Sequence, residues 1–381
     1  MNIVKAEFYD DFRCIAGQCS FTCCKGWDIV VDKDTLEKWS NDEQSDYFGK
    51  NVKSKKHGKV TDTYIKVGPR KCCPFFNDKG LCNIVINHGE YYLTQTCRLF
   101  PRQENCFGEK KEYSLSCACP AVVDIISDIK AMMRFVHDGD ESSPEQMPKE
   151  YWIRKSMIAI MQNRDLSVTD RLLLIFRMLL SVKLKPDSYK EIVSRYEDGT
   201  YLSSIVDIWK DAEMERSDSL LETNELFLDI VQNYRNEKQY SGYLEELYEL
   251  AEELDTDDAL TEWDDFKRVF GQYDKVMENC IVSKIFADCV NDDLNEMIIS
   301  YQMIITEYTM VRHSAFLTWL YSNAKSKGLP DVKSVDYSII RDYIVIYSRI
   351  IGYNADGMKE FRKDCFDEAV WEFGYMLLLI S

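Results

Sequence analysis

The pattern of apolar and polar positions changes character near Pro120. Beyond it, apolar residues recur three and four positions apart, as at Phe227, Ile230 and Val231, which is the spacing of an amphipathic helix. Before it, apolar residues come in short groups between turn residues. The pattern predicts an irregular front and a helical back, with a polar, proline-containing linker at about residues 138–150.

The back of the chain is predicted to be a succession of helices with little strand signal. No fixed-period repeat is present, so a solenoid is not supported. The expected helices cover residues 121–136, 153–161, 168–184, 203–209, 221–234, 243–254, 263–290, 294–326 (with a break allowed), 335–351 and 355–379.

The front of the chain contains only short expected elements. Residues 28–31 and 60–67 have the composition or alternation of strands, and residues 34–39 suit a brief helix with Asp34 as its N-cap. The predicted fold class is therefore mainly α. A small irregular, Cys-rich, metal-binding N-terminal domain with few short strands, residues 1–120, packs on an all-α helical domain, residues 121–381.

The charge divides at the same place. The 381 residues carry a net charge of −18, of which residues 1–120 contribute +2 and the remainder −20. An acidic back repels nucleic acid, so no nucleic-acid partner is expected; it is either a solvated surface or a docking surface for a basic partner. No apolar run approaches the ~18 residues of a membrane span, and no secretory signal precedes the first acidic residues, so we expect a soluble, cytoplasmic protein without a membrane partner.

The cysteines are concentrated in the front. Eleven of the 14 lie between Cys14 and Cys119, and four of these fall in the loop from Cys14 to Trp27. Disulfides rarely persist in the cytoplasm, so a disulfide knot is the weaker interpretation. Thiolates are soft ligands, and their density in a Gly-bearing loop predicts a zinc or iron–sulfur site.

The candidate ligands come from several short turns. Because neighbouring side chains diverge, only one of Cys23 and Cys24 is expected to be a ligand of the same metal as the other thiols. Arg98 and Arg102 flank one cysteine, and they pair either with cofactor carboxylates or with acids of the front itself; with Trp27 they are the candidate cofactor-binding residues. The predicted centre contains Cys19, Cys24, Cys73 and Cys97, with one or more of Cys14, Cys23 and Cys82.

Several motifs are absent. No two glycines lie two apart, so a Rossmann-type G-x-G loop is excluded, and neither a Walker-type loop nor H-E-x-x-H occurs. The cysteine spacing of radical S-adenosylmethionine enzymes, Cys-x3-Cys-x2-Cys, is incomplete: Cys19 and Cys23 fit it, but Gly26 occupies the third cysteine position. The four histidines are scattered, and His313, inside an expected helix, is predicted to be a packing residue. No catalytic residue is assigned from the sequence.

The order of the thiol motifs resembles that of the flagellin lysine-N-methyltransferases, bacterial enzymes that methylate lysine amines of the flagellar filament protein. The front is also similar to a broader cysteine-rich family described as zinc- or iron-chelating, and residues 278–286 are similar to a segment of the methyltransferases. The motifs are Cys14-x4-Cys19-x3-Cys23-Cys24-x-Gly26-Trp27, Cys73-Pro-Phe-Phe, Leu81-Cys82-x-Ile84, Thr96-Cys97-Arg98-x-Phe100-Pro101-Arg102 and Ser114-Leu-Ser-Cys117-x-Cys119-Pro120.

This resemblance implies an enzyme that uses S-adenosylmethionine as methyl donor, a [4Fe–4S] cluster and flagellin as protein substrate. The residues by themselves show only the thiols. Two alternatives stay open: a zinc- or iron-binding sensor or metal-handling protein with a helical partner-binding domain, and a structural zinc module on a helical interaction protein.

Overall fold

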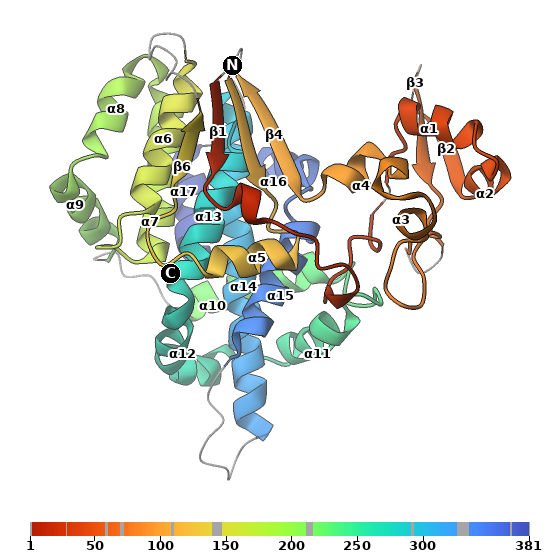
Figure 1. Ribbon diagram of the computed structural model, residues 1–381. Coiled ribbons are helices and arrows are strands. Elements are labelled where there is room, and N and C mark those ends of the chain that lie inside the picture. The colour runs from red at the N-terminus through yellow and green to blue at the C-terminus, as the bar shows by residue number, and fades with distance from the viewer. Residues whose placement is uncertain are drawn as a thin grey trace.

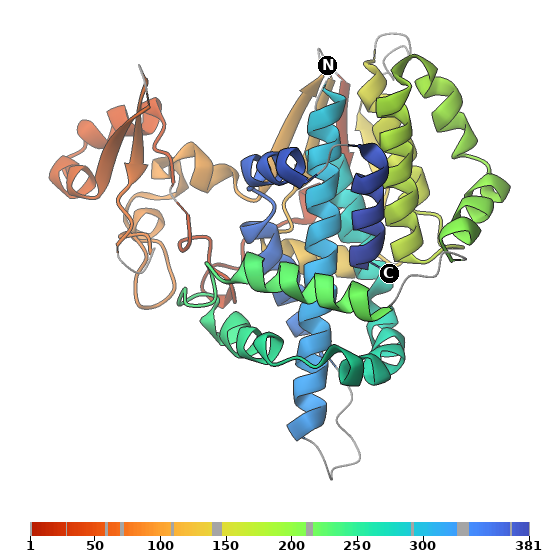
Figure 2. The same cartoon turned by 180° about the vertical axis from the view of Figure 1, so that it is seen from behind.

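The fold is described from a computed structural model that covers residues 2–27, 29–57, 60–68, 72–107, 110–138, 147–210, 216–290, 293–325, 335–365 and 368–380. Helices predominate in these ranges and the strands are few and short, which confirms the predicted fold class (Figure 1). A small unit stands out to one side of a large helical body (Figures 1 and 2).

A four-stranded sheet joins the front of the chain to the body. Its strand order is β4-β5-β1-β6, with β1 parallel to β5 and the other two pairings antiparallel. Ala6 of β1 and Leu115 of β5 are buried in the same large core as the helices. The strands are β1 (Asn2–Ala6), β4 (Arg102–Phe107), β5 (Lys110–Leu115) and β6 (Phe135–Asp138).

The small unit is the chain between β1 and β4, and it has a separate core around Trp39, Phe48 and Phe75. Trp39 stacks on Phe48 with ring centroids 4.7 Å apart. Short 3₁₀ turns lie at Tyr9–Asp11, Ala16–Gln18 and Glu90–Tyr92. Its elements are α1 (Lys33–Ser40), α2 (Ser45–Lys50), β2 (Val52–His57), β3 (Val60–Ile65), α3 (Asn83–His88) and α4 (Gln95–Leu99).

Two expectations for the small unit need correction. The N-cap of α1 is Asp32 rather than Asp34, because Asp32 has extended backbone angles and its carboxylate accepts the Thr35 N–H. The expected strand at residues 28–31 is only an isolated bridge between Val30 and Tyr64, and Asp28 lies outside the described residues.

The helix predicted at 121–136 is also wrong in its second half. Helix α5 (Pro120–Ser127) ends early, and Phe135–Asp138 forms β6 instead. The open edge of β1 offers this segment a hydrogen-bonding partner, and Phe135 stacks on Phe286 of the body with ring centroids 4.2 Å apart. Tertiary pairing therefore overrides the local helical pattern. The predicted linker falls mostly outside the described residues.

The helical body follows the predicted periodicity. The expected helix 263–290 is two helices separated by a 3₁₀ turn at Gly271–Tyr273, and residues 355–379 also form two helices. A further short helix, α8, follows a 3₁₀ turn at Pro186–Ser188. The helices are α6 (Lys149–Met161), α7 (Val168–Leu184), α8 (Tyr189–Arg195), α9 (Gly199–Lys210), α10 (Arg216–Val231), α11 (Ser241–Glu252), α12 (Thr256–Phe270), α13 (Asp274–Asp288), α14 (Leu294–Lys325), α15 (Tyr337–Ile350), α16 (Ala355–Cys365) and α17 (Ala369–Ile380).

Helix α14 runs through the middle of the body as one unbroken helix (Figure 2). It packs against α7, α13 and α15, among others, and its buried residues include Tyr301 and Phe316. Because the helix is covered on several sides, its polar residues, such as Glu307 and His313, are buried with hydrogen-bonding partners and do not form an exposed stripe. No helix in the part of the chain that the structure describes is both long and apolar enough to cross a membrane.

Buried ion pairs fasten the sheet to the body. Glu112 of β5 is buried and lies 2.6 Å from the Arg154 guanidinium of α6, which also donates to the Phe286 carbonyl of α13. Lys110 lies 3.2 Å from the same carboxylate. Buried charges are costly without partners, so these contacts fix how the sheet sits on α6 and α13.

Candidate functional site: a thiol core beside the helical body

The small unit brings five cysteines to one place. Cys73 is buried in its apolar core, and Cys24, Cys82 and Cys97 pack against the same core. Cys23 interacts electrostatically with Cys97 and forms a hydrogen bond with Cys24. We call these five residues the thiol core.

Backbone pairing sets the position of the first three thiols. The Cys73 N–H donates to the Cys24 carbonyl over 2.8 Å, and Lys25 forms an antiparallel bridge with Cys72. The turn after Cys73 folds back, so that Cys82 forms a bridge with Phe76. Cys24, Cys73 and Cys82 are therefore carried by adjoining extended segments.

Two turn devices complete this arrangement. Gly80 has a φ of +76°, a left-handed conformation that favours glycine, and it closes the turn between Cys73 and Cys82. Cys97 lies in α4, whose N-cap Thr94 accepts the Cys97 N–H over 3.2 Å. The fourth segment is thus held in a fixed orientation by its cap.

Burial governs the protonation of these thiols. Loss of solvent raises the pKa of Cys73 to about 12, and the Cys97 and Cys82 thiols add to the shift. Burial likewise raises the pKa of Cys97 to about 11, with Cys23 and Cys82 contributing. Each thiolate would face other thiolates, so the ionised forms need a positive charge among them, which a metal ion or cluster supplies.

The adjacent Cys23 and Cys24 are not equivalent. A hydrogen bond from the Cys24 thiol lowers the pKa of Cys23 to about 7, and the same bond raises the pKa of Cys24. The Arg349 guanidinium also favours the Cys23 thiolate. Cys23 is therefore the member of this pair that ionises first. Because the thiolate is the form that binds a metal, Cys23 is the better candidate ligand of the two.

The donor chemistry of the thiol core suits an iron–sulfur cluster or zinc, since both prefer thiolates. All 14 cysteines are free thiols. Among the residues that the structure describes, however, no three His, Cys, Asp or Glu side chains form a group that could hold a metal ion. The ligand type therefore fits, while a closed ligand shell requires the side chains of the thiol core to turn toward a common centre.

The structure places the other two candidate ligands farther along the loop. Cys14 is exposed, and its sulfur accepts the Ala16 N–H over 3.4 Å. Cys19 is half-buried, donates to the Phe21 carbonyl and interacts electrostatically with Cys14 and Cys23. Cys19 is also near the buried Cys119, whose pKa burial raises to about 12. Cys14 and Cys19 thus lie outside the apolar core of the small unit, with Cys19 close to Cys23 of the thiol core.

Arg349 of α15 is a residue that the sequence did not single out. Its buried guanidinium donates to the carbonyls of Phe21 and Ala118 over 2.9 and 3.0 Å. Its Cζ lies 5.1 Å from the centre of the Trp27 ring. Arg349 therefore clamps the loop from Cys14 to Trp27, which we call the thiol loop, onto the body. No local pattern marks it, because α15 contains other polar residues, such as Arg341 and Ser348.

The three candidate cofactor-binding residues lie in different surroundings. Trp27 donates its indole N–H to the Cys23 carbonyl over 2.8 Å and so belongs to the thiol loop. Arg98 is exposed on α4, and the guanidinium carbon of Arg102 lies 5.1 Å from the centre of the Phe12 ring. Of the three, Trp27 is the one that donates a hydrogen bond to the thiol loop, while Arg98 follows Cys97 on α4.

A second polar group is buried where α13 meets α14 and α15. Lys284 lies 2.6 Å from the Glu307 carboxylate and donates to Ser348 over 2.9 Å. Close by, the Cys117 and Cys280 thiols are hydrogen-bonded to each other, and Lys284 favours the ionised form of Cys117. These groups satisfy one another within a packed interface, so they stabilise the position of α13.

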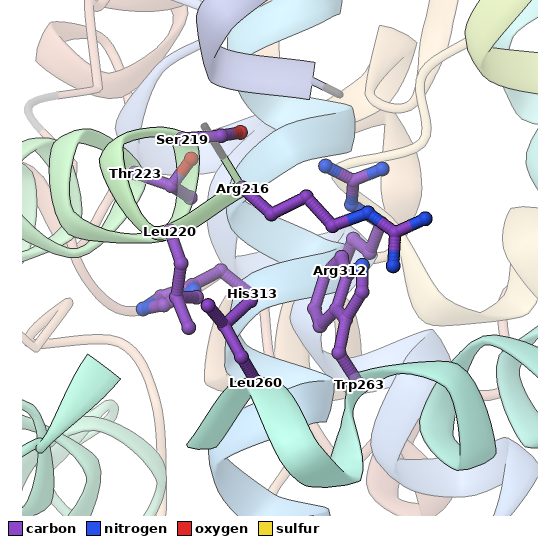
Figure 3. Close-up of a pocket in the computed structure, with 8 residues that line it drawn as sticks. All are labelled: Arg216, Ser219, Leu220, Thr223, Leu260, Trp263, Arg312 and His313. Carbon is purple, nitrogen blue, oxygen red and sulfur yellow. The ribbon is translucent and has the colours of Figure 1, made fainter. Parts of the chain in front are cut away.

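One small cavity is lined by two arginines and a histidine (Figure 3). Arg216 comes from α10, Trp263 from α12, and Arg312 and His313 from α14. Its volume is about 20 Å³, which is room for a water molecule and no larger ligand. It is therefore a packing feature of the helical body.

The helical body matches a known protein family. The family model described as the FliB lysine N-methylase C-terminal domain matches residues 154–379, from the first turns of α6 to the end of α17. The chain belongs to this family. The expected family and enzyme class, a lysine N-methyltransferase, are thereby confirmed, while the thiol core lies outside the matched range.

Individual relatives match smaller parts of the chain. The flagellar biosynthetic protein FliU of Salmonella muenchen is 30% identical over 137 residues, which are 35% of this chain and 81% of that protein. Lysine-N-methylases of Salmonella choleraesuis (strain SC-B67) and Salmonella typhimurium (strain LT2) are each 29% identical over 140 residues. That match spans 35% of this chain and 34% of each enzyme. No solved structure gives a significant match.

Proposed function

We propose that this protein transfers methyl groups from S-adenosylmethionine to surface lysines of flagellin, and that its thiol core holds a [4Fe–4S] cluster. The family match over the helical body supports lysine methylation. The flagellar name of one relative, FliU, supports a substrate in the flagellum. We further propose that the protein acts in the cytoplasm, where free thiols are maintained.

The proposed reaction is a simple methyl transfer. The lone pair of a lysine amine attacks the methyl carbon of the sulfonium donor, the new N–C bond forms as the S–C bond breaks, and the donor leaves as a neutral thioether. The lysine must be neutral to attack, so its proton passes to a base or to water first. The protein's task is to align the amine with the methyl group and exclude water.

In this proposal Cys23, Cys73, Cys82 and Cys97 hold the cluster, and Cys24 supports Cys23 through its hydrogen bond. A bound cluster would supply positive charge that keeps these buried thiols ionised, and with four cysteine ligands it would hold the segments of the thiol core together. The Arg349 charge adds to the stabilisation of the Cys23 thiolate from the side of the body.

The charge of the helical body supports a lysine-bearing substrate. Residues 121–381 carry a net charge of −20, which attracts a basic protein surface. Because exposed charges are screened over ~10 Å at 0.1 M salt, binding of flagellin should weaken as salt rises.

The test is to incubate the anaerobically purified protein with flagellin of its own organism and the donor, and to look for additions of about 14 Da on lysine by mass spectrometry. The Cys73→Ser/Cys97→Ser variant should lose the additions, while Cys365→Ser, at an exposed thiol outside the thiol core, should retain them. Absence of methylation by the cluster-loaded wild type would contradict the proposal.

A metal sensor or zinc module is the second candidate. The raised pKa values of Cys73 and Cys97 favour it, because a metal that binds these protonated thiols displaces their protons, and its affinity therefore depends on pH. The colour of the anaerobic preparation separates the two metals. A brown protein indicates an iron–sulfur cluster, and a colourless protein containing zinc supports the second candidate.

A further inference from the structure

A large cavity lies in the helical body, apart from the thiol core. It is open to solvent on one side and is lined by residues of α10, α14, the end of α15, α16 and α17, and its volume is about 460 Å³. Cavities of about 300–1,000 Å³ are typical of sites for small organic ligands and cofactors.

The floor and one wall of the cavity are apolar and aromatic. Met303, Met376 and Leu379 line it and are almost fully buried. Phe361 of α16 and Tyr375 of α17 form a wall, with ring centroids 5.6 Å apart. Such a surface suits the flat ring of a ligand and, through the ring faces, a neighbouring positive charge.

The charge of the cavity has one sign. Glu222, Glu225 and Asp229 line it from α10, and no lysine or arginine is found among the lining residues that the structure describes. The spacing of three and four residues places these carboxylates on one face of the helix. They span about 10 Å along the axis at 1.5 Å per residue, so they can contact separate parts of one ligand.

Two walls of the cavity end in turns that touch the thiol loop. Asn354 lines the cavity, and its neighbour Tyr353 packs against Trp27. Tyr234 also lines the cavity and meets Tyr240, which in turn stacks on Phe21 of the thiol loop. A ligand in the cavity is therefore linked to the thiol loop through a single layer of aromatic residues on each side.

We propose that this cavity binds the methyl donor as a nucleoside sulfonium cation: the aromatic wall contacts the base, and the α10 carboxylates contact the ribose hydroxyls and balance the positive sulfur. This inference rests on the proposed function. A lysine side chain is a narrow chain with a single ammonium group, which fills only part of the volume and contacts only one of three spaced carboxylates. The size and the spread of charge therefore favour the donor over the lysine.

The experiment measures binding of the donor and of its demethylated thioether product by calorimetry, using the full chain in wild-type form and as Glu222→Gln and Asp229→Asn. The matched control is Asp218→Asn, an exposed acid on the same helix that does not line the cavity. Circular dichroism and thermal unfolding establish that each variant is folded. A second variant, Leu226→Trp, reduces the cavity volume at a half-buried lining position without changing charge.

The proposal expects each carboxylate variant to bind the donor about tenfold more weakly, with a smaller effect on the product, whose sulfur carries no charge. Leu226→Trp should weaken both ligands, and Asp218→Asn neither. Unchanged donor binding in all cavity variants, with a raised KM for flagellin, would overturn the proposal and assign the cavity to the lysine. If the wild type methylates flagellin but every cavity variant binds donor normally, only this inference fails; if the wild type binds no donor at all, the proposed function fails with it.

Discussion

Trp27 and Tyr353 meet edge to face, with ring centroids 5.8 Å apart. Trp27 belongs to the thiol loop and Tyr353 to the turn between α15 and α16, so this contact joins the Cys-rich front to the matched family domain. Gly26 lies against Gln239 beside it, so closely that a β-carbon at Gly26 would be 2.1 Å from the Gln239 side-chain nitrogen. The thiol loop is thus fitted to the body on two sides.

Trp27→Ala should loosen the thiol loop while the helical body stays folded. The substitution removes both the Tyr353 contact and the hydrogen bond to the Cys23 carbonyl. Amide hydrogen exchange in residues 14–27 should become about tenfold faster or more, because the loop can open locally without the free-energy cost of breaking these contacts. Trp371→Ala, at a tryptophan that is 67% exposed on α17, is the control and should leave exchange in this loop unchanged.

Replacement of Cys73 or Cys97 by Ser should lower the metal content of the anaerobically purified protein by half or more, since each supplies a buried thiol that serine does not replace as a soft ligand. Cys106→Ser, at an exposed thiol on β4, should retain full metal content. Iron, sulfide and zinc analysis with the absorbance spectrum gives the measurement. Equal metal content in all three variants would exclude the thiol core as the metal site.

Glu278→Gln should destabilise the body by about 3–5 kcal/mol, because it leaves a buried arginine without its counter-charge. The Glu278 carboxylate lies 2.7 Å from Arg171, whose side chain is only 4% exposed, and 2.9 Å from Arg164. Urea unfolding gives the free energy. Glu191→Gln, which removes the exposed pair with Arg195, is the matched control and should be close to neutral. A neutral effect at Glu278 would show that the pair is not a stabilising contact.

His313 should make the stability depend on pH. Burial, aided by the Arg312 charge, lowers the pKa of His313 to about 3, and its Nε2 lies 3.0 Å from the Asn224 side-chain oxygen. The unfolded chain therefore binds a proton below about pH 6.5 that the folded chain does not. The free energy of unfolding is therefore unaffected by His313 above about pH 6.5. As the pH falls from there toward 3, this free energy decreases by at most about 1.4 kcal/mol per pH unit.

The His313 term can be isolated with His313→Gln, which keeps a neutral side chain at the same position and removes the titration. Its unfolding free energy should fall less steeply than that of the wild type between pH 6.5 and 5. His137→Gln, at an exposed position on β6, should follow the wild-type curve. Identical pH slopes for wild type and His313→Gln would contradict the prediction.

The helical back was predictable because its periodicity is local. Val168–Leu184 is found where the pattern predicts it, and α14 is continuous across the break that was allowed. The sheet was not expected because β1 acquires its partners only through β5 and β6, more distant in the chain. A strand of five residues carries too little alternation to identify without them.

The sequence identified the cysteines of the candidate site, but not how they are arranged, and the metal they are predicted to bind stays a prediction. Clustered cysteines indicate a soft-metal site from the sequence alone, but which thiols meet depends on pairings such as Cys24 with Cys73. The role of Arg349 depends on the carbonyls of Phe21 and Ala118, which come from remote parts of the chain. Neither relationship leaves a mark in local sequence.

The parallel pairing of β1 with β5 has a consequence for how the protein is made. The first strand leaves the ribosome early, yet its neighbour in the sheet follows only after the whole small unit, about 100 residues later. Closing a loop of that length costs only slightly more than closing one half as long, so the delay is tolerated thermodynamically. We therefore expect the small unit to form its own core before β1 and β5 pair.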